Sequence, residues 1–377
     1  MNLYVLKFGG SSIATVNRIN NVANIISNMK KLCNNIIVVT SAMQGVTDKL
    51  LAYTKEFDII NYDDNYYRES DAIVSCGESI ASGILSIALQ SIGINAKSFN
   101  SWQIPIEASS TYSNATIMNI HTETLFNAIN NDVVPVITGF QGLSKNNDIV
   151  TLGRGGSDAT ACALAYYTNA NECYIYTDVS GVFTADPRVV NNAKIITCIS
   201  YDEMLELAKY GAKVLQYKSV LLSKQYNVKV RVLSSFTNDN CSSLVTNTTY
   251  YTNEKQIAGI SHSTNYILLN TKSNIDSVIE KYEIIQLSEN NYLVKKSVLD
   301  NIINIITDNE YIIDNDIGII TVVGKGFFNI TNKLEQLLTQ NNVKIKHINI
   351  NDISVTYVIH FSQTEYALNI LHKYIYD

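Results

Sequence analysis

The stretch LYVLKFGGSS, residues 3–12, decides how the chain begins and where we expect its ligand. Its apolar first half predicts a buried β-strand, with Lys7 near the end of that strand. Gly9 and Gly10 follow, and glycine lets a backbone approach a bound group closely. The two serines after them can cap a helix, whose N-terminus attracts anions. The pattern predicts a phosphate site, or alternatively a tight strand-to-helix turn with a lysine that reaches solvent.

The composition is that of a globular protein with room for more than one domain. The chain has 377 residues, of which 46% are hydrophobic and 16% are charged, against a typical charged share of about 25%. A chain of this length predicts two or three domains. The net charge of −6 provides no basic surface, so we do not expect nucleic acid as a partner.

The cysteines and the apolar runs indicate where the protein resides. Six cysteines are scattered without a C-x-x-C pair, which favours small core residues in a reducing compartment over zinc ligands or disulfides. The N-terminus leads directly into the first predicted strand, without the features of a signal peptide. No uninterrupted apolar run approaches the ~18 residues of a membrane-spanning helix. We therefore expect a cytoplasmic protein with no membrane partner.

Predicted strands and helices alternate through the first half of the chain. The predicted helices span residues 16–31 and 72–89, the second after a polar loop or loose helix at 58–69, and continuous apolar runs predict strands at 36–40 and 133–138. Small-residue loops follow these strands, and Glu78 lies in the first half of the second helix. This order indicates an α/β sheet whose ligands bind at the carboxyl ends of its strands.

A second glycine-rich loop, TLGRGGSDAT at residues 151–160, precedes an apolar helix predicted at 161–167. Asp158 has an ordinary explanation, because the helix dipole favours a carboxylate in a first turn. Arg154 has no comparable structural explanation, since a glycine loop offers its side chain no apolar surface to cover. We therefore favour a role for Arg154 in binding a ligand. A strand predicted at 173–176 then ends in the polar stretch TDVSGVFTADPR, residues 177–188, which suggests nucleotide contacts.

Common nucleotide-binding and hydrolase motifs are absent from the sequence. Neither glycine loop has the G-x-x-x-x-G-K-[ST] pattern of a P-loop or the G-x-G-x-x-G pattern of a Rossmann site. No G-x-S-x-G elbow occurs, and none of the five histidines lies beside a candidate nucleophile. These absences disfavour P-loop, Rossmann and serine-hydrolase chemistry.

Three motifs in order resemble the aspartokinase family. They are KFGGSS at 7–12, GRGGSD at 153–158 and YTDVSGVFTADPR at 176–188, and the likeness continues through GAKVL at 211–215 to about residue 235. The resemblance implies an α/β amino-acid-kinase fold, which is an open, mostly parallel sheet of about eight strands between helices. Two ferredoxin-like ACT units would follow this domain.

The resemblance also implies ATP-dependent phosphorylation of the β-carboxylate of L-aspartate, with Mg²⁺, as the first step toward lysine or diaminopimelate, threonine and methionine. The implied catalytic residues are Lys7 and Asp158; the substrate-binding residues are Ser41, Thr47, Glu78, Arg154, Gly155 and Ser157; the ATP-binding residues are Lys7, Gly9, Gly10, Ser11, Thr177, Asp178, Phe183, Arg188 and Lys213. We name no protein ligand for Mg²⁺, which we expect to bind mainly phosphate oxygens and water.

The second part of the chain repeats one pattern twice. Each round reads as strand, helix, two strands and helix, the pattern of a ferredoxin-like unit. We expect a kinase domain at 1–245, a polar linker from about 238 to 256 and interleaved ACT units at 257–377, with an inserted unit at 266–313 and a second unit built from 257–263 and 316–377. Exposed edges of such units favour pairing, so we expect a homodimer.

Two departures from the family pattern leave questions open. Phe183 stands where tyrosine is common, so packing would replace one hydrogen bond to the nucleotide. Residues 271–276, TKSNID, lack the Asp-x-Pro-Gly type of loop of regulated members, which leaves feedback inhibition in doubt. The alternative functions are a kinase for glutamate, acetylglutamate or uridylate, and a catalytically silent amino-acid sensor.

Overall fold

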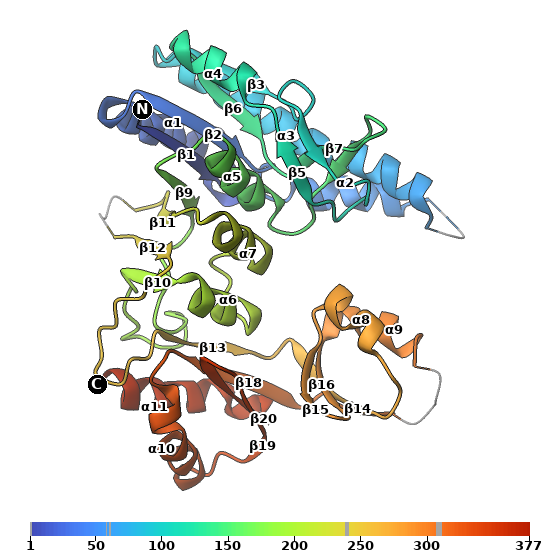
Figure 1. The fold of residues 1–377 in the computed structure, drawn as a ribbon, viewed down its shortest axis with the longest axis vertical. Coiled ribbons are helices and arrows are strands. Elements are labelled where there is room, and N and C mark those ends of the chain that lie inside the picture. Colours follow the sequence, from blue (N-terminus) through green and yellow to red (C-terminus); the bar gives the residue numbers. More distant parts are fainter. Residues whose placement is uncertain (1, 58, 60–61, 238–240, 307–310) are drawn as a thin grey trace. The chain divides into compact units, whose positions relative to one another are not determined.

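The computed structural model describes residues 2–57, 59, 62–237, 241–306 and 311–377 (Figure 1). The chain divides into two compact units. The first comprises Met1–Val182, Thr197–Tyr201 and Val214–Thr249, and the second comprises Phe183–Ile196, Asp202–Lys213 and Tyr250–Asp377. The second unit thus takes two short segments from the region of the kinase motifs. The domain boundaries expected at residues 245 and 257 remain a prediction.

The first unit is built on an eight-stranded sheet with the order β10-β12-β11-β9-β1-β2-β6-β3. Its strands are β1 Leu3–Phe8, β2 Asn35–Thr40, β3 Ala96–Phe99, β6 Val134–Thr138, β9 Glu172–Thr177, β10 Cys198–Ser200, β11 Val230–Ser234 and β12 Ser243–Thr246. All neighbours from β11 to β3 are parallel, whereas β12 runs antiparallel to β11. The prediction of an open, mostly parallel sheet of about eight strands is confirmed. The linker expected from residue 238 is wrong in part, because it contains β12.

Helices cover both faces of this sheet (Figure 1). They are α1 Val16–Leu32, α2 Val46–Lys55, α3 Asp64–Ser91, α4 Glu123–Asn130, α5 Gly156–Tyr167 and α7 Tyr217–Tyr226, with the short 3-10 helix η1 Gly10–Ile13 after β1. Leu6 and Phe8 of β1 pack in one apolar cluster with residues of α1 and α3. Side chains alternate along a strand, so Lys7 leaves β1 on the opposite face, on which α5 packs.

Three expectations about helix ends need correction. The serines at 11 and 12 do not cap α1; they lie in η1, and Thr15 caps α1 by accepting the N–H of Arg18 at 3.3 Å. The second predicted helix begins at residue 64 instead of 72, because Asp63 caps it by accepting the N–H of Tyr66 at 3.0 Å. Residues 58, 60 and 61 of the polar stretch lie outside the described residues. The helix expected at 161–167 begins at Gly156, inside the glycine loop.

The long helix α3 is a core helix of the first unit. By length and composition it is the one helix among the described residues that could cross a membrane, because serine, glycine and alanine separate its isoleucines and leucines without lowering the mean hydropathy much. The search for uninterrupted apolar runs in the sequence did not detect this helix. Half of its most apolar window is buried, and it packs on α1, α2, β3 and β6. Its buried residues include two carboxylates, Asp71 and Glu78.

A small second sheet of the first unit was not predicted. It has the order β5-β4-β7-β8, with β4 Ile106–Ala108, β5 Ile117–Ile120, β7 Gln141–Leu143 and β8 Ile149–Thr151. Strands of three or four residues are too short to show a clear alternation of apolar and polar residues. The sheet matters for the site because β8 ends at Thr151, three residues before Arg154.

The second unit contains two four-stranded antiparallel sheets. One has the order β13-β18-β20-β19 and the other β15-β16-β14-β17. Their elements are β13 Gly259–Ser263, β14 Tyr266–Thr271, α8 Asp276–Tyr282, β15 Ile285–Ser288, β16 Asn291–Lys295, η2 Lys296–Val298, α9 Leu299–Ile303, β17 Tyr311–Asp314, β18 Ile317–Val323, α10 Phe327–Gln340, β19 Ile345–Ile350, β20 Ser354–His360, η3 Phe361–Gln363 and α11 Thr364–Tyr376, together with α6 Tyr201–Lys209. The ferredoxin-like pattern is confirmed. The fourth strand of each unit comes from a different place in the chain. In the inserted unit it is β17, which pairs with β14, and in the other unit it is β13, which precedes the inserted unit and pairs with β18.

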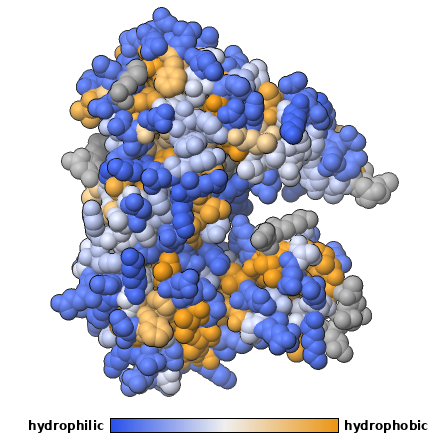
Figure 2. Space-filling view, viewed as in Figure 1, coloured by the Kyte–Doolittle hydropathy of each residue, from blue (hydrophilic) through white to orange (hydrophobic). Residues whose placement is uncertain are grey.

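Apolar side chains of the strands and helices form a buried core beside each sheet. The visible surface is largely hydrophilic with scattered apolar residues (Figure 2). In the β13-β18-β20-β19 sheet, the contact between β18 and α11 is close at one glycine. A Cβ atom on Gly318 would lie 1.9 Å from Oγ1 of Thr364, whose hydroxyl donates to the carbonyl of Phe361 at 2.7 Å. The approach of helix to strand therefore requires glycine here.

We expect Gly318→Ala to lower the free energy of unfolding by about 1–3 kcal/mol, because overpacking forces the helix away from the strand. Thermal unfolding of the single variants and of Gly318→Ala/Thr364→Ala would measure this. Removing the hydroxyl opens space, so the double variant should be more stable than the sum of the single effects implies. Strictly additive effects would contradict this explanation.

Candidate active site

A cleft of about 310 Å³ lies in the first unit at the carboxyl ends of β1 and β2. All eight residues predicted as catalytic or substrate-binding line it, namely Lys7, Ser41, Thr47, Glu78, Arg154, Gly155, Ser157 and Asp158. They come from four separate parts of the chain, which the parallel sheet gathers at one edge. The cleft is the candidate active site, and the roles of the residues remain predictions.

Lys7 and Asp158 form a nearly buried ion pair between the main sheet and the helix that covers it. Nζ of Lys7 lies 2.6 Å from Oδ1 of Asp158, and each residue is 8% exposed. Asp158 is the third residue of α5, where the helix dipole favours a carboxylate. The pair fixes the lysine at the wall of the cleft. A cation held there can stabilise negative charge on a reacting group.

Glu78 is a buried carboxylate of α3 with one oxygen bonded and the other free. Oε1 accepts the N–H of Ala42 at 2.9 Å, while Oε2 is buried without a hydrogen-bond partner among the described residues. Burial raises the pKa of Glu78 to about 7, although the N–H of Ala42 opposes this shift. Gly77 permits the close approach, because a Cβ atom there would lie 2.7 Å from that of Ala42. An ammonium group in the cleft would satisfy Oε2.

Arg154 is the unpaired cation of the cleft. Its side chain is exposed and makes no ion pair or hydrogen bond with any residue that the structure describes. The next residue, Gly155, is the N-cap of α5 with φ of +77°, and a Cβ atom there would lie 2.5 Å from that of Gln216. Only glycine fits this turn. The guanidinium is therefore free to bind a carboxylate through two parallel hydrogen bonds.

The charges of the cleft suit a small molecule that itself carries charges of both signs. Lys7, Arg154 and the N-terminus of α5 are positive, and Asp158 is negative. Glu78 becomes negative as the pH rises through its pKa of about 7. Glu78 can accept hydrogen bonds from an ammonium, and Arg154 can donate to a carboxylate. The hydroxyl groups of Ser41 and Thr47 add neutral hydrogen-bonding groups. An amino acid with a second carboxylate matches this arrangement.

Besides Lys7, five predicted nucleotide-binding residues of the first unit lie near the carboxyl ends of β1 and β9. The N–H of Gly9 donates to a carbonyl near the end of β9 at 3.3 Å, and the hydroxyl of Thr177 donates to Asp178 at 3.1 Å. Gly10 begins η1, where a Cβ atom would lie 2.8 Å from the carbonyl of Ala42. Ser11 follows it in η1. The three loops after β1, β2 and β9 thus begin side by side.

The other three predicted nucleotide-binding residues, Phe183, Arg188 and Lys213, belong to the second unit. Phe183 forms an isolated bridge with Ile195, and Arg188 donates two hydrogen bonds to Asp186 at 2.9 and 2.6 Å. The hydrogen bonds from Arg188 lower the pKa of Asp186. Lys213 is exposed. None of the three is among the residues that line the cleft, and their role remains a prediction.

Several residues of the cleft were not predicted from the sequence: Ala42, Phe140, Gly153, Gly156 and Gln216. Phe140 carried a usable signal, since it follows the predicted strand at 133–138 and ligands bind beyond the carboxyl ends of such strands. Ala42 carried the same signal, since it follows the predicted strand at 36–40, whereas Gln216 carried none. Ala42 acts through its backbone N–H, and Gln216 acts by filling the space that the glycine at 155 leaves.

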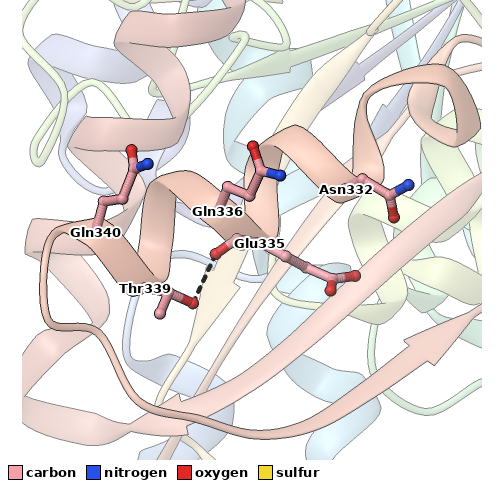
Figure 3. Close-up of a pocket in the computed structure, with 5 residues that line it drawn as sticks. All are labelled: Asn332, Glu335, Gln336, Thr339 and Gln340. Carbon is pink, nitrogen blue, oxygen red and sulfur yellow. Dashed lines mark hydrogen bonds between the residues drawn. The ribbon is translucent and has the colours of Figure 1, made fainter.

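A larger hollow of about 440 Å³ lies along α10 in the second unit (Figure 3). Its lining residues, Asn332, Glu335, Gln336, Thr339 and Gln340, all project from that single helix (Figure 3). The hydroxyl of Thr339 is occupied, since it donates to the carbonyl of Glu335 at 2.9 Å. Because no second element supplies charged groups, the cleft at Lys7 is the better candidate despite its smaller volume.

No group of three or more histidine, cysteine, aspartate or glutamate residues suited to a metal ion occurs within the described parts of the chain. Asp158, the carboxylate nearest Lys7, is engaged in the ion pair.

Comparisons with known proteins show what this chain is similar to. Residues 2–234 match the sequence profile of the Amino acid kinase family. The aspartokinase of Rickettsia felis is 35% identical over 389 residues, which cover 97% of each chain. An aspartokinase of Bacillus sp. strain MGA3 is 33% identical over 402 residues, covering 99% of this chain and 97% of the relative. The fold resembles that of E. coli aspartokinase III in complex with aspartate and ADP, with a TM-score of 0.82, 20% identity and full coverage of both chains.

The raised pKa of Glu78 predicts a pH-dependent stability. The carboxylate titrates at about 7 in the folded protein, against 4.5 for the ordinary group, so its contribution is fully present below pH 4.5 and is lost as the pH rises through 7. Glu78→Gln removes this titration. Relative to the unsubstituted protein, Glu78→Gln should therefore gain up to about 3 kcal/mol in free energy of unfolding between pH 5 and pH 8. Its melting temperature, compared with that of the unsubstituted protein at each pH, should rise over the same range. A constant difference across this range would contradict the assignment.

Proposed function

Because the chain belongs to the aspartokinases of the amino acid kinase family, we infer that it transfers the γ-phosphoryl group of ATP to the β-carboxylate of L-aspartate. The products are 4-phospho-L-aspartate and ADP. This reaction begins the pathway to lysine or diaminopimelate, threonine and methionine. The observation that carries the inference is a match over 97% of the chain together with one cleft that combines Lys7, Glu78, Arg154 and Asp158.

The reaction needs no general base. The β-carboxylate has an ordinary pKa of about 3.9 and is already an ionised nucleophile at neutral pH. One of its oxygens attacks the γ-phosphorus, and the bond from that phosphorus to the β–γ bridging oxygen breaks, so the electron pair leaves with ADP. Catalysis then consists of positioning the reactants and stabilising charge on the transferred group. Mg²⁺, held by phosphate oxygens and water, would supply part of that stabilisation.

We propose that Arg154 and Glu78 hold the two ends of the amino acid that do not react. The guanidinium of Arg154, free of partners among the described residues, would bind the α-carboxylate in a bidentate manner. The buried Oε2 of Glu78 would accept a hydrogen bond from the α-ammonium. Ser41 and Thr47 line the same cleft and would add hydrogen bonds, together with Gly155 and Ser157 at the start of α5.

We propose that Lys7 contacts the transferred phosphoryl group, with Asp158 holding its ammonium in place at 2.6 Å. Gly9, Gly10 and Ser11 follow Lys7 and Phe8. The backbone N–H groups of Gly10 and Ser11 would face the phosphates, whereas the N–H of Gly9 already donates to a carbonyl near the end of β9. The remaining ATP contacts are proposed for Thr177, Asp178, Phe183, Arg188 and Lys213 on the strength of the family motifs.

We propose that the protein acts in the cytoplasm, as a homodimer formed through residues 257–377, without nucleic acid or membrane partners. Support for the dimer comes from the sheet edges. The strands β13, β15, β17 and β19 each end a sheet order, and two of them carry large exposed side chains, since Ile312 of β17 is 71% exposed and Ile350 of β19 is 52% exposed. Unpaired edges with apolar side chains favour association with a second copy.

Formation of a hydroxamate from the acyl phosphate in the presence of hydroxylamine tests the proposed reaction. ATP with L-aspartate should give the product, whereas glutamate and N-acetylglutamate should not. Release of ADP with uridylate as acceptor would be measured separately. Turnover of any of these three acceptors in place of aspartate would favour another kinase of the family, and no turnover at all would favour a sensor.

Lys7→Ala should lower kcat by about 10²–10³-fold or more, because it removes a cation from the transferred group. Lys30→Ala is a matched control, since Lys30 also forms an ion pair with an aspartate at 2.6 Å but lies outside the cleft. Steady-state kinetics and thermal unfolding of both variants would be compared. Turnover of Lys7→Ala within about threefold of the unsubstituted protein would overturn this role.

Arg154→Ala and Glu78→Ala should raise the KM for aspartate much more than the KM for ATP, because they remove contacts to the amino acid. Asp178→Ala and Lys213→Ala should show the opposite bias. Initial rates with each substrate varied in turn would measure both constants. Equal changes of both constants in all four variants would refute this division of the site.

Ile350→Asp and Ile312→Asp should weaken the homodimer, because each places a charge on an exposed edge strand. Sedimentation velocity over a range of concentrations would report the dimer and its dissociation. Leu32→Asp at the end of α1 in the first unit is the control, as Leu32 is 82% exposed but lies outside residues 257–377. A monomeric unsubstituted chain would exclude the dimer, and a dimer unaffected by both substitutions would exclude pairing at these edges.

A further inference from the structure

The carboxylate of Asp71 binds two separate backbone segments near the glycine loop of Arg154. Asp71 lies on α3, is 1% exposed and accepts four hydrogen bonds. Its Oδ2 accepts the N–H groups of Ser113 and Thr151, each at 2.8 Å, and its Oδ1 accepts their hydroxyl groups at 3.1 and 2.8 Å. Every donor belongs to one of two residues. Thr151 is the last residue of β8, three positions before Arg154.

The ammonium of Lys218 binds the same two segments through their acceptors. Lys218 lies on α7, and its Nζ donates to the carbonyl of Leu152 at 2.8 Å, to the carbonyl of Ala115 at 3.0 Å and to Oδ1 of Asn114 at 3.1 Å. These three acceptors match the three hydrogens of an ammonium. Lys218 forms no ion pair with any carboxylate in the parts of the chain that the structure describes.

The two segments also contact each other directly. The N–H of Ala115 donates to the carbonyl of Thr151 at 2.9 Å. A Cβ atom on Gly153 would lie 3.0 Å from Oδ1 of Asn114 and 3.1 Å from the carbonyl of Ser113, so the 113–114 backbone lies against the residue that precedes Arg154. Residues 113–115 therefore form the support of the loop at 151–155. A carboxylate fixes this support through its donors, and an ammonium fixes it through its acceptors.

Burying Asp71 and Lys218 without an ion pair costs folding free energy. This cost argues that the position of the loop they hold is important. Burial raises the pKa of Asp71, although its four hydrogen bonds oppose the shift, and burial lowers the pKa of Lys218. Neutral side chains could join two loops without this cost. Two ions of opposite sign hold a backbone more rigidly, because charge-assisted hydrogen bonds are about twice as strong as neutral ones.

We propose that Asp71 and Lys218 are positioning residues that hold the 151–155 loop so that Arg154 meets the α-carboxylate of the substrate. Neither side chain lines the cleft, so both act through the loop and not on the substrate. The inference rests on the proposed role of Arg154. It adds two residues, from α3 and α7, that set the affinity for the amino acid without touching it.

A double-mutant cycle between Lys218→Met and Arg154→Ala tests the proposal. Lys218→Met keeps most of the side-chain stem but removes the ammonium. In the otherwise unsubstituted protein it should raise the KM for aspartate about five- to tenfold and leave the KM for ATP within about twofold, because a misplaced contact loses binding to one substrate. In the Arg154→Ala background the same substitution should change the KM for aspartate by less than about twofold, because its effect runs through the arginine.

Two further variants separate positioning from stability. Asp71→Asn should reproduce the loss of aspartate affinity and the dependence on Arg154. Arg231→Met is the control, since Arg231 is a half-buried cation of the same unit that pairs with Glu172 at 2.7 Å on β9, away from the loop. It should leave the KM for aspartate within about twofold, even if its melting temperature falls. If Asp71→Asn does not fold, the cycle with the half-buried Lys218 still decides the outcome.

The outcomes distinguish this proposal from the site assignment on which it rests. If Arg154→Ala leaves the KM for aspartate unchanged, the proposed role of Arg154 is wrong, and the positioning role fails with it. If Arg154→Ala raises that KM but Lys218→Met does not, only the positioning role is overturned. Equal losses from Lys218→Met with and without Arg154 would also overturn it, because the residue would then act on overall structure.

Discussion

The ion pair between Lys7 and Asp158 is the constraint on which the arrangement of the active site depends. It joins the central strand of the sheet to the first turn of a covering helix, almost out of contact with water. Leaving either charge alone there would be strongly unfavourable, so the strand and the helix must meet in this register. That register places the glycine loop before the helix in the same cleft as Lys7. The two motifs that dominate the sequence are thus joined by one contact.

Two other charged residues of the cleft, Glu78 and Arg154, are also positioned by contacts from other elements. Glu78 is held by the N–H of Ala42, and the loop of Arg154 is held from α3 and α7. A reaction without proton transfer demands this kind of precision, because its rate depends on distance and charge alone. On the proposed function, rigidity around the cleft therefore serves the positioning of the reactants as well as stability.

The sequence predicts the charged residues of the site that lie in glycine-rich loops. It misses the residues that act through contacts with the backbone. Glycine loops with a lysine, an arginine and an aspartate are conspicuous, and parallel strands gather them at one edge. Asp71 lies on the same helix as Glu78, two turns earlier, yet the helix was expected to begin just after it. Lys218 binds only carbonyl and amide oxygens, so no charged partner in the sequence points to it. The three-residue strands of the small sheet, which carry the arginine loop, are too short to show a period.

The interleaving of the two antiparallel sheets has a consequence for the order of folding. The partners β13 and β18 are separated by more than fifty residues, and joining distant segments costs chain entropy. Between them lies one complete sheet, in which Leu268 of β14 pairs with Asp314 of β17. Once that sheet has formed, the ends of β13 and β18 are each two residues from strands that are already neighbours, and their pairing closes only a short loop. The inserted unit therefore acts as a template for the outer one, because it shortens the loop that closes when β13 pairs with β18.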